Sequence, residues 1–153
     1  MHKWWLWIIV VLGISCQQDA GEVQMRDVNN LWAKNQAQEF QLDIKDADVP
    51  KNLIFIIRNN QNYPYSNLFL IATLAQNGKP IKTDTLNYRL ANPDGSWIGS
   101  GFGDTKEGWF QYKEYYQFPK NGIYTLSIKQ GMRQDTLRGI EDIGIKIQTL
   151  TSK

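Results

Sequence analysis

Apolar and polar residues alternate at every second position along much of this chain, and no part of its body repeats apolar residues at helical spacing. Between residues 40 and 45, for example, Phe40, Leu42 and Ile44 alternate with polar side chains. A period of two is typical of strands that bury one face, whereas a helix needs apolar residues three or four positions apart. The pattern therefore predicts an all-β domain.

Further strands are predicted where the same alternation recurs or where a short apolar run suits a central strand: 53–57, 67–76, 81–90, 109–118, 123–128 and 143–150. Turn residues separate these segments. Asn77-Gly78 is a pair that tolerates positive φ in a tight hairpin, and Pro93 and Gly95 mark a second turn. Seven to nine strands with short connections predict a single antiparallel β-sandwich of the Greek-key, immunoglobulin-like or jelly-roll-like type.

A late tyrosine bears on the kind of sandwich. In immunoglobulin-like domains, a tyrosine near the start of a late strand caps a corner by bonding its hydroxyl group to the backbone. Tyr124 stands near the start of the segment 123–128. Two interpretations are open at this stage: a corner tyrosine, or an ordinary half-buried one.

The first sixteen residues have the layout of a lipoprotein signal. A short positive start precedes eleven mostly apolar residues, Trp4 to Ile14, and the chain's single cysteine, Cys16, follows. Eleven residues are too few to cross about 30 Å of hydrocarbon but suit the core of a signal peptide. We expect a signal peptide at 1–15 and a lipid on the thiol of Cys16. The alternatives are a cleaved secretory signal and a buried free cysteine.

This layout divides the chain into three parts. After the signal peptide, residues 16–37 are polar with scattered apolar positions, and we expect a lipid-anchored tether that includes an edge strand around Val23 and Met25. Residues 38–153 then form the sandwich. Acylation consumes the chain's one thiol, so the fold must stand without disulfides.

The side chains required by most hydrolytic and metal chemistry are missing from the expected mature chain. The one histidine, His2, lies in the signal peptide. A Ser-His-Asp triad, a Cys-His pair and a His-ligated zinc site are therefore excluded. Five acids remain for a carboxylate pair, without a recognisable frame: Asp84, Asp94, Asp104, Glu107 and Glu114. We expect no enzymatic activity, no cofactor and no metal. The alternative to the absence of a metal is a calcium ion bound in the loop 92–104.

Charge argues against a nucleic-acid partner. The chain has 17 Lys and Arg residues against 15 Asp and Glu residues, which gives a net charge of +2, and no basic stripe is visible. Attachment to a membrane would therefore come from the lipid rather than from charge.

Aromatic residues gather in the third quarter of the chain. Exposed aromatic rings on sandwiches can stack on sugars, so Trp97 and Trp109 are candidate stacking residues, and a lipid-anchored carbohydrate-binding module is the alternative function. Alternation places Trp109 and Tyr115 on one face of their strand and Tyr112 and Tyr116 on the other. At least one of these two sets must belong to the core.

The loop "NNQNYPYSN" at 59–67 lies between two strongly apolar strands. Pro64 stiffens it and biases Tyr63 toward extended geometry. Tyr63 and Tyr65 are either a structural latch, with both hydroxyl groups bonded inside the fold, or a binding epitope with large contact area at low entropic cost. Arg133 is a second candidate for protein interaction, because arginine and aromatic side chains are enriched at interface hot spots.

Three blocks of the sequence, "RNNQNYPYSNL" at 58–68, "DTLNYRLANPDGSWIGSGFGD" at 84–104 and "FPKNGIYTLSIKQGMRQDTLRGIEDIGIKI" at 118–147, resemble the GldH family of gliding motility-associated lipoproteins from Bacteroidetes. The resemblance implies a non-enzymatic component or assembly factor of the gliding or secretion machinery. It also implies envelope proteins of that apparatus as partners and an outer-membrane location. Some lipoproteins of these bacteria are directed to the cell surface by an acidic cluster after the cysteine. Here Asp19 is the one acid close behind Cys16, which favours the periplasmic face over the alternative, the cell surface.

Overall fold

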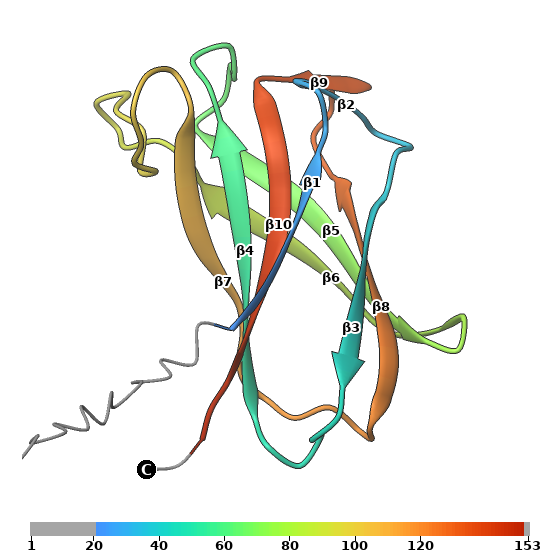
Figure 1. Ribbon diagram of the computed structural model, residues 1–153. Coiled ribbons are helices and arrows are strands. Elements are labelled where there is room, and N and C mark those ends of the chain that lie inside the picture. Colours follow the sequence, from blue (N-terminus) through green and yellow to red (C-terminus); the bar gives the residue numbers. More distant parts are fainter. Residues whose placement is uncertain (1–20, 152–153) are drawn as a thin grey trace, which may run out of the picture.

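The computed structural model describes residues 21–151, which form an antiparallel β-sandwich (Figure 1). The strands are β1 (Glu22–Asp27), β2 (Leu31–Ala33), β3 (Gln38–Ile44), β4 (Lys51–Asn59), β5 (Asn67–Gln76), β6 (Lys79–Arg89), β7 (Lys106–Tyr116), β8 (Gly122–Gln130), β9 (Thr136–Arg138) and β10 (Ile140–Thr149). The predicted all-β class is confirmed. The described residues hold ten strands rather than seven to nine, because β2 and β9 have three residues each and are too short to show a period. No helix within these residues is long and apolar enough to cross a membrane.

Two four-stranded sheets face each other across the core. One, the β4 sheet, has the order β1-β10-β4-β7, and the other, the β5 sheet, has the order β3-β8-β5-β6. A short ribbon of β2 and β9 lies at one end. The chain crosses repeatedly between the sheets, from β3 to β4, back to β5, and again from β6 to β7 and from β7 to β8. Segments far apart in sequence therefore become neighbours.

The predicted turn and corner residues act as expected. Asn77 and Gly78 have φ values of 51° and 72°. Positive φ at both central residues is what the tight turn between β5 and β6 requires. Tyr124 is fully buried, donates its hydroxyl hydrogen to the carbonyl oxygen of Lys120 at 2.7 Å and accepts from the Lys120 N–H at 3.2 Å. The interpretation of Tyr124 as a corner tyrosine is thus confirmed.

The core is filled by the inward-facing residues of both sheets. The largest fully buried side chains are Trp32, Tyr124, Phe40, Phe55, Leu42, Ile44, Leu53, Ile57, Leu68, Leu70, Leu90 and Leu126. Trp32 comes from β2 and donates its indole N–H to the carbonyl oxygen of Gln36 at 2.9 Å. β1 pairs with β10 and forms one edge of the β4 sheet. The described residues before position 38 are therefore part of the sandwich.

Side chains join the two sheets along one edge, where β6 and β7 meet. Asp84 accepts hydrogen bonds from the Tyr112 hydroxyl at 3.0 Å and from the Lys113 ammonium at 2.8 Å. Burial raises the pKa of Asp84, but the bonds from Lys113 and Tyr112 bring the pKa below its ordinary value. The Tyr88 hydroxyl donates to the Gln111 carbonyl at 2.9 Å. These contacts keep the edge strands from splaying.

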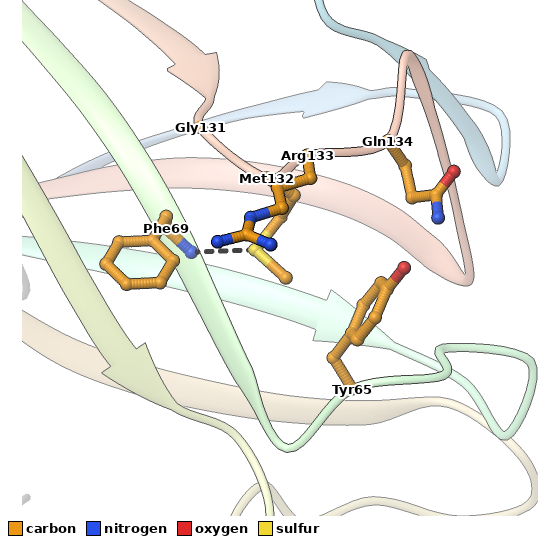
Figure 2. A pocket seen from close by; sticks show the side chains of 6 residues that line it. All are labelled: Tyr65, Phe69, Gly131, Met132, Arg133 and Gln134. Atoms are coloured by element: carbon orange, nitrogen blue, oxygen red, sulfur yellow. Dashed lines mark hydrogen bonds between the residues drawn. The ribbon is translucent and has the colours of Figure 1, made fainter.

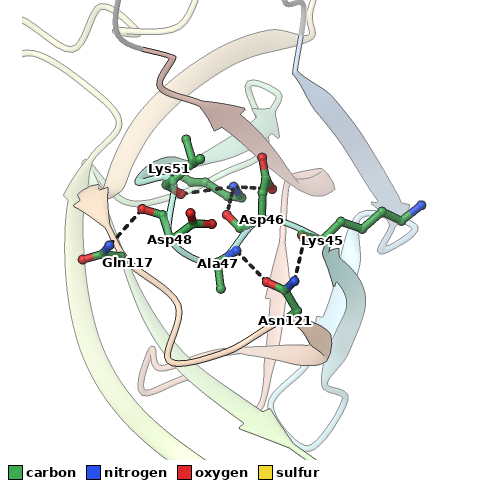
Figure 3. A network of polar contacts seen from close by, with 8 residues as sticks. Lys45, Asp46, Ala47, Asp48, Lys51, Gln117 and Asn121 are labelled. Carbon is green, nitrogen blue, oxygen red and sulfur yellow. Dashed lines mark hydrogen bonds and ion pairs between the residues drawn. The ribbon is translucent and has the colours of Figure 1, made fainter.

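The two ends of the sandwich differ in character. We call the end that carries the loops 45–50 and 117–121 the N-terminal end, because β1 begins toward it: Glu22 pairs with Ile147, which pairs with Leu53, two residues after Lys51. There the buried ammonium of Lys51 donates to the Asp46 carboxylate at 2.9 Å and to two backbone carbonyls (Figure 3). Asn121 ties the loops together through the backbone on either side of Asp46. The opposite end carries the loops 60–66, 90–105 and 131–135.

Candidate functional site

Tyr63 is held beneath the surface at the end of the sandwich opposite the loops 45–50 and 117–121. Its side chain is 3% exposed, and its hydroxyl group donates to the carbonyl oxygen of Asn67 at 2.6 Å. Burial raises the pKa of this hydroxyl group, and the nearby Tyr65 adds to the shift. The ring of Tyr63 packs edge-on against that of Tyr65, with the centroids 5.8 Å apart. Tyr63 thus has the internal hydrogen bond that a latch needs and almost no surface for a partner.

Gly139 allows the segment before β10 to approach the tyrosine loop. Its φ of 81° favours glycine, and a Cβ at this position would collide with the backbone of Asn62 and Tyr63. The N–H of Asn60 donates to the Gly139 carbonyl at 2.9 Å. The amide side chain of Asn60 also donates to Glu141 at 2.8 Å. The tyrosine loop is therefore fixed to the start of β10.

A second loop, the turn at 131–134, is stapled by a buried glutamine. The side chain of Gln130 is 1% exposed, accepts from the N–H of Met132 at 2.8 Å and donates to the carbonyl of Gln134 at 2.9 Å. The turn is also joined to β5: the Gly131 N–H donates to the Phe69 carbonyl at 2.7 Å, and the Phe69 N–H donates to the Met132 sulfur at 3.3 Å. These bonds fix the backbone from which Arg133 projects.

The two loops enclose a pocket of about 470 Å³ on the β5 sheet (Figure 2). Its lining residues are Tyr65, Phe69, Gly131, Met132, Arg133 and Gln134, and we call it the Tyr65–Arg133 pocket. Tyr65 is half-buried, Phe69 is 37% exposed and Met132 is buried. Arg133 is exposed and belongs to no ion pair within residues 21–151. The structure therefore brings together two of the residues that the sequence singled out for protein interaction.

Sequence reasoning missed Phe69, Met132 and the stapling role of Gln130. A signal was present for Phe69, because Leu68 and Leu70 alternate inward and place a large aromatic residue on the outer face of β5. An outward phenylalanine next to a turn is a candidate for binding. Nothing in the local sequence reveals the Gln130 staple, since it depends on the shape of the turn.

The two candidate sugar-stacking residues lie in different environments. Trp97 is half-buried against the core, with its ring 6.4 Å from that of Tyr63. Trp109 is 54% exposed on the outer face of β7, donates its indole N–H to Glu107 at 2.7 Å and has the Lys146 ammonium 4.8 Å from its ring centroid. Tyr115 is exposed on β7 as well, whereas Tyr112 is buried. The expected division of this strand into a core face and an outer face is confirmed.

Four of the five acids considered for catalysis or calcium binding, all but Glu114, are engaged in separate local contacts. Asp94 accepts from the N–H and hydroxyl groups of Ser96, at 2.9 and 2.6 Å, and Asp104 accepts from Gln61 at 3.3 Å. Glu107 accepts from Trp109 and from Arg58, and these bonds lower its pKa. Within residues 21–151, no three His, Cys, Asp or Glu side chains gather in a metal-binding cluster.

Cys16, the signal peptide at 1–15 and the first part of the expected tether lie outside the residues that the structure describes.

Comparison with known proteins gives a family and two close relatives. The family model described as GldH lipoprotein matches residues 22–147, a range that includes the whole Tyr65–Arg133 pocket. The gliding motility lipoprotein GldH of Flavobacterium johnsoniae is 36% identical over 150 residues, covering 94% of this chain and 93% of the relative. The gliding motility lipoprotein GldH homolog of Christiangramia forsetii is 36% identical over 146 residues, covering 91% and 90%.

Proposed function

The chain belongs to the GldH lipoprotein family, and we propose that it is a lipid-anchored, non-enzymatic docking component of the gliding or secretion machinery of the outer membrane. Its partners are other envelope proteins of that apparatus. The names of the two relatives, both gliding motility lipoproteins, support the motility role. The lipid is carried by Cys16 after removal of residues 1–15, and a short tether between Cys16 and β1 leads into the sandwich, whose first two strands lie before position 38.

The short link between Cys16 and β1 supports docking through the end of the sandwich that lies away from the membrane. Five residues, 17–21, separate Cys16 from the first described strand, and they reach about 18 Å at most when fully extended. The N-terminal end, with the Lys51 network, would therefore lie next to the bilayer. β10 has 10 residues, which corresponds to about 33 Å of strand. The opposite end, with the tyrosine loop and the turn at 131–134, is held out toward partners.

The observation that carries the proposal is the Tyr65–Arg133 pocket itself. Binding sites are usually concave, largely apolar and equipped with a few fixed polar groups. Here Phe69 and Met132 supply apolar walls, and Tyr65 and Arg133 supply the side-chain types that dominate interface hot spots. Both sides of the pocket are held by internal hydrogen bonds, so a partner would meet a surface that is already formed.

We place the protein on the periplasmic face of the outer membrane, because Asp19 is the one acid among the four residues after Cys16. The cell surface is the alternative location. Proteinase treatment of intact cells distinguishes the two, since a periplasmic protein survives it and a surface protein is degraded.

The test of the proposed function is replacement of the chromosomal gene by one encoding Tyr65→Ala and Arg133→Ala together. We expect normal expression and membrane fractionation, with loss of co-purifying envelope proteins and of motility or secretion. Trp109→Ala is the matched control, because it removes an exposed aromatic side chain from the outer face of β7 and leaves the pocket intact. Wild-type co-purification and motility in the double variant would contradict the proposal.

The exposure of Trp109 is the one observation that favours the alternative, a carbohydrate-binding module. Selective retention on an immobilised envelope glycan, abolished by Trp109→Ala and kept by the double variant, would support that function instead.

A further inference from the structure

We propose that the Tyr65–Arg133 pocket binds a polypeptide segment in which an apolar side chain lies next to a carboxylate group. This inference rests on the proposed function and names the chemistry of the partner. The carboxylate belongs either to the end of the partner chain or to an Asp or Glu side chain, because the same group is recognised in both cases.

The apolar part of the segment is indicated by the pocket walls. Phe69 leaves 37% of its surface in water, although its strand neighbours are buried. Met132 adds a thioether, which adapts its shape to different apolar groups. Covering such a surface with an apolar side chain is favourable in proportion to the area removed from water.

The carboxylate is indicated by the charge of the pocket. Arg133 brings a guanidinium group to a lining that contains no acidic residue. Its donors form a planar fork that matches the two oxygens of a carboxylate. The hydroxyl group of Tyr65 is a second donor on the opposite wall, and it has no hydrogen-bond partner within residues 21–151. An anionic group is therefore complementary to the polar atoms of this pocket.

Size and position favour a polypeptide segment. About 470 Å³ holds one or two side chains, so only a short stretch of the partner chain enters the pocket. The pocket lies at the end of the sandwich opposite the loops 45–50 and 117–121, toward which β1 begins, so it faces away from a bilayer attached at the N-terminal end. The latch at Tyr63 and the staple at Gln130 hold both walls in place, so the partner segment bears most of the ordering cost.

The test uses the full chain in lipid nanodiscs and three fluorescein-labelled peptides, with empty nanodiscs as the blank. The first peptide is Gly-Ser-Phe with a free terminal carboxylate, the second is the same peptide amidated, and the third is Gly-Phe-Asp amidated. Fluorescence polarisation measures the dissociation constant of each. We expect the first or the third to bind about 5-fold more tightly than the second, which corresponds to a well-placed, solvent-accessible ion pair.

Variants assign the effect to the pocket. Arg133→Gln should remove the preference for a carboxylate and leave the affinity for the second peptide, which has no carboxylate, unchanged. Arg138→Gln, a matched change on β9 outside the pocket lining, should keep the preference for a carboxylate. Phe69→Ala should weaken the binding of all three peptides by a similar factor. Arg133 is exposed, so its replacement should not unfold the protein.

Three results would overturn the inference: equal affinity for the three peptides, no binding of any peptide at millimolar concentration, or a carboxylate preference that survives in Arg133→Gln. Each of them would leave the docking function standing if the Tyr65 and Arg133 double variant still loses its partners in cells. The two proposals therefore fail separately.

Discussion

Replacing Tyr63 by phenylalanine removes one hydroxyl group from the interior and leaves the ring in place. That hydroxyl group donates to the Asn67 carbonyl at 2.6 Å from a side chain that is 3% exposed, so water has little access to replace it. The lost hydrogen bond is worth about 1 kcal/mol, and the carbonyl left unsatisfied adds up to about 1 kcal/mol more. We expect the free energy of unfolding to fall by about 1–2 kcal/mol.

Urea denaturation followed by tryptophan fluorescence measures this change as a lower midpoint at an unchanged slope. For a domain of this size the melting temperature should drop by about 2–8 °C. Tyr65→Phe is the matched control. Its hydroxyl group has no hydrogen-bond partner within residues 21–151, so we expect a change below about 0.5 kcal/mol. Equal small changes in both variants would refute the latch.

Three further predictions follow from the structure and the sequence. Gly139→Ala should destabilise the protein by at least about 2 kcal/mol in the same urea assay, because the alanine would have a positive φ and its Cβ would collide with the tyrosine loop. A change near zero would contradict the close approach of Gly139 to that loop. Stability should be kept below about pH 10 and lost as the pH rises further, because burial raises the folded pKa of four tyrosines and the unfolded chain ionises first. The urea midpoint should therefore be lower at about pH 11 than at about pH 9, and equal midpoints would contradict this prediction. These tyrosines are Tyr63, Tyr88, Tyr112 and Tyr116. Cys16→Ser should block acylation and give an uncleaved or soluble precursor; membrane fractionation at the wild-type size would contradict the lipid anchor.

The strands could be predicted from sequence because burial of one sheet face imposes a period of two on the chain. Seven predicted segments correspond to β3, β4, β5, β6, β7, β8 and β10. The two strands with three residues each could not be found this way, since they span less than two periods. The local chemistry of Asn77-Gly78 and Tyr124 was equally readable, because each acts on residues a few positions away.

The pocket could not be predicted, because its two halves meet only through the register of β5 and β8. Leu70 pairs with Gln130, and this places Tyr65 and Phe69 beside the turn that follows β8. No period or motif in the sequence specifies that pairing. The sequence does not decide between latch and epitope for Tyr63 for a similar reason, since the burial of Tyr63 depends on the approach of Gly139 from a distant segment.

Site-specific photo-crosslinking in living cells tests most directly whether the protein docks through its pocket. A photoreactive phenylalanine at position 134, on the pocket rim, is compared with one at position 120, in a loop at the N-terminal end. We expect a defined crosslinked envelope protein from position 134, with a lower yield when Arg133→Gln is added, and no such product from position 120. The same product from both positions, or one from position 134 whose yield is unchanged by Arg133→Gln, would contradict the account.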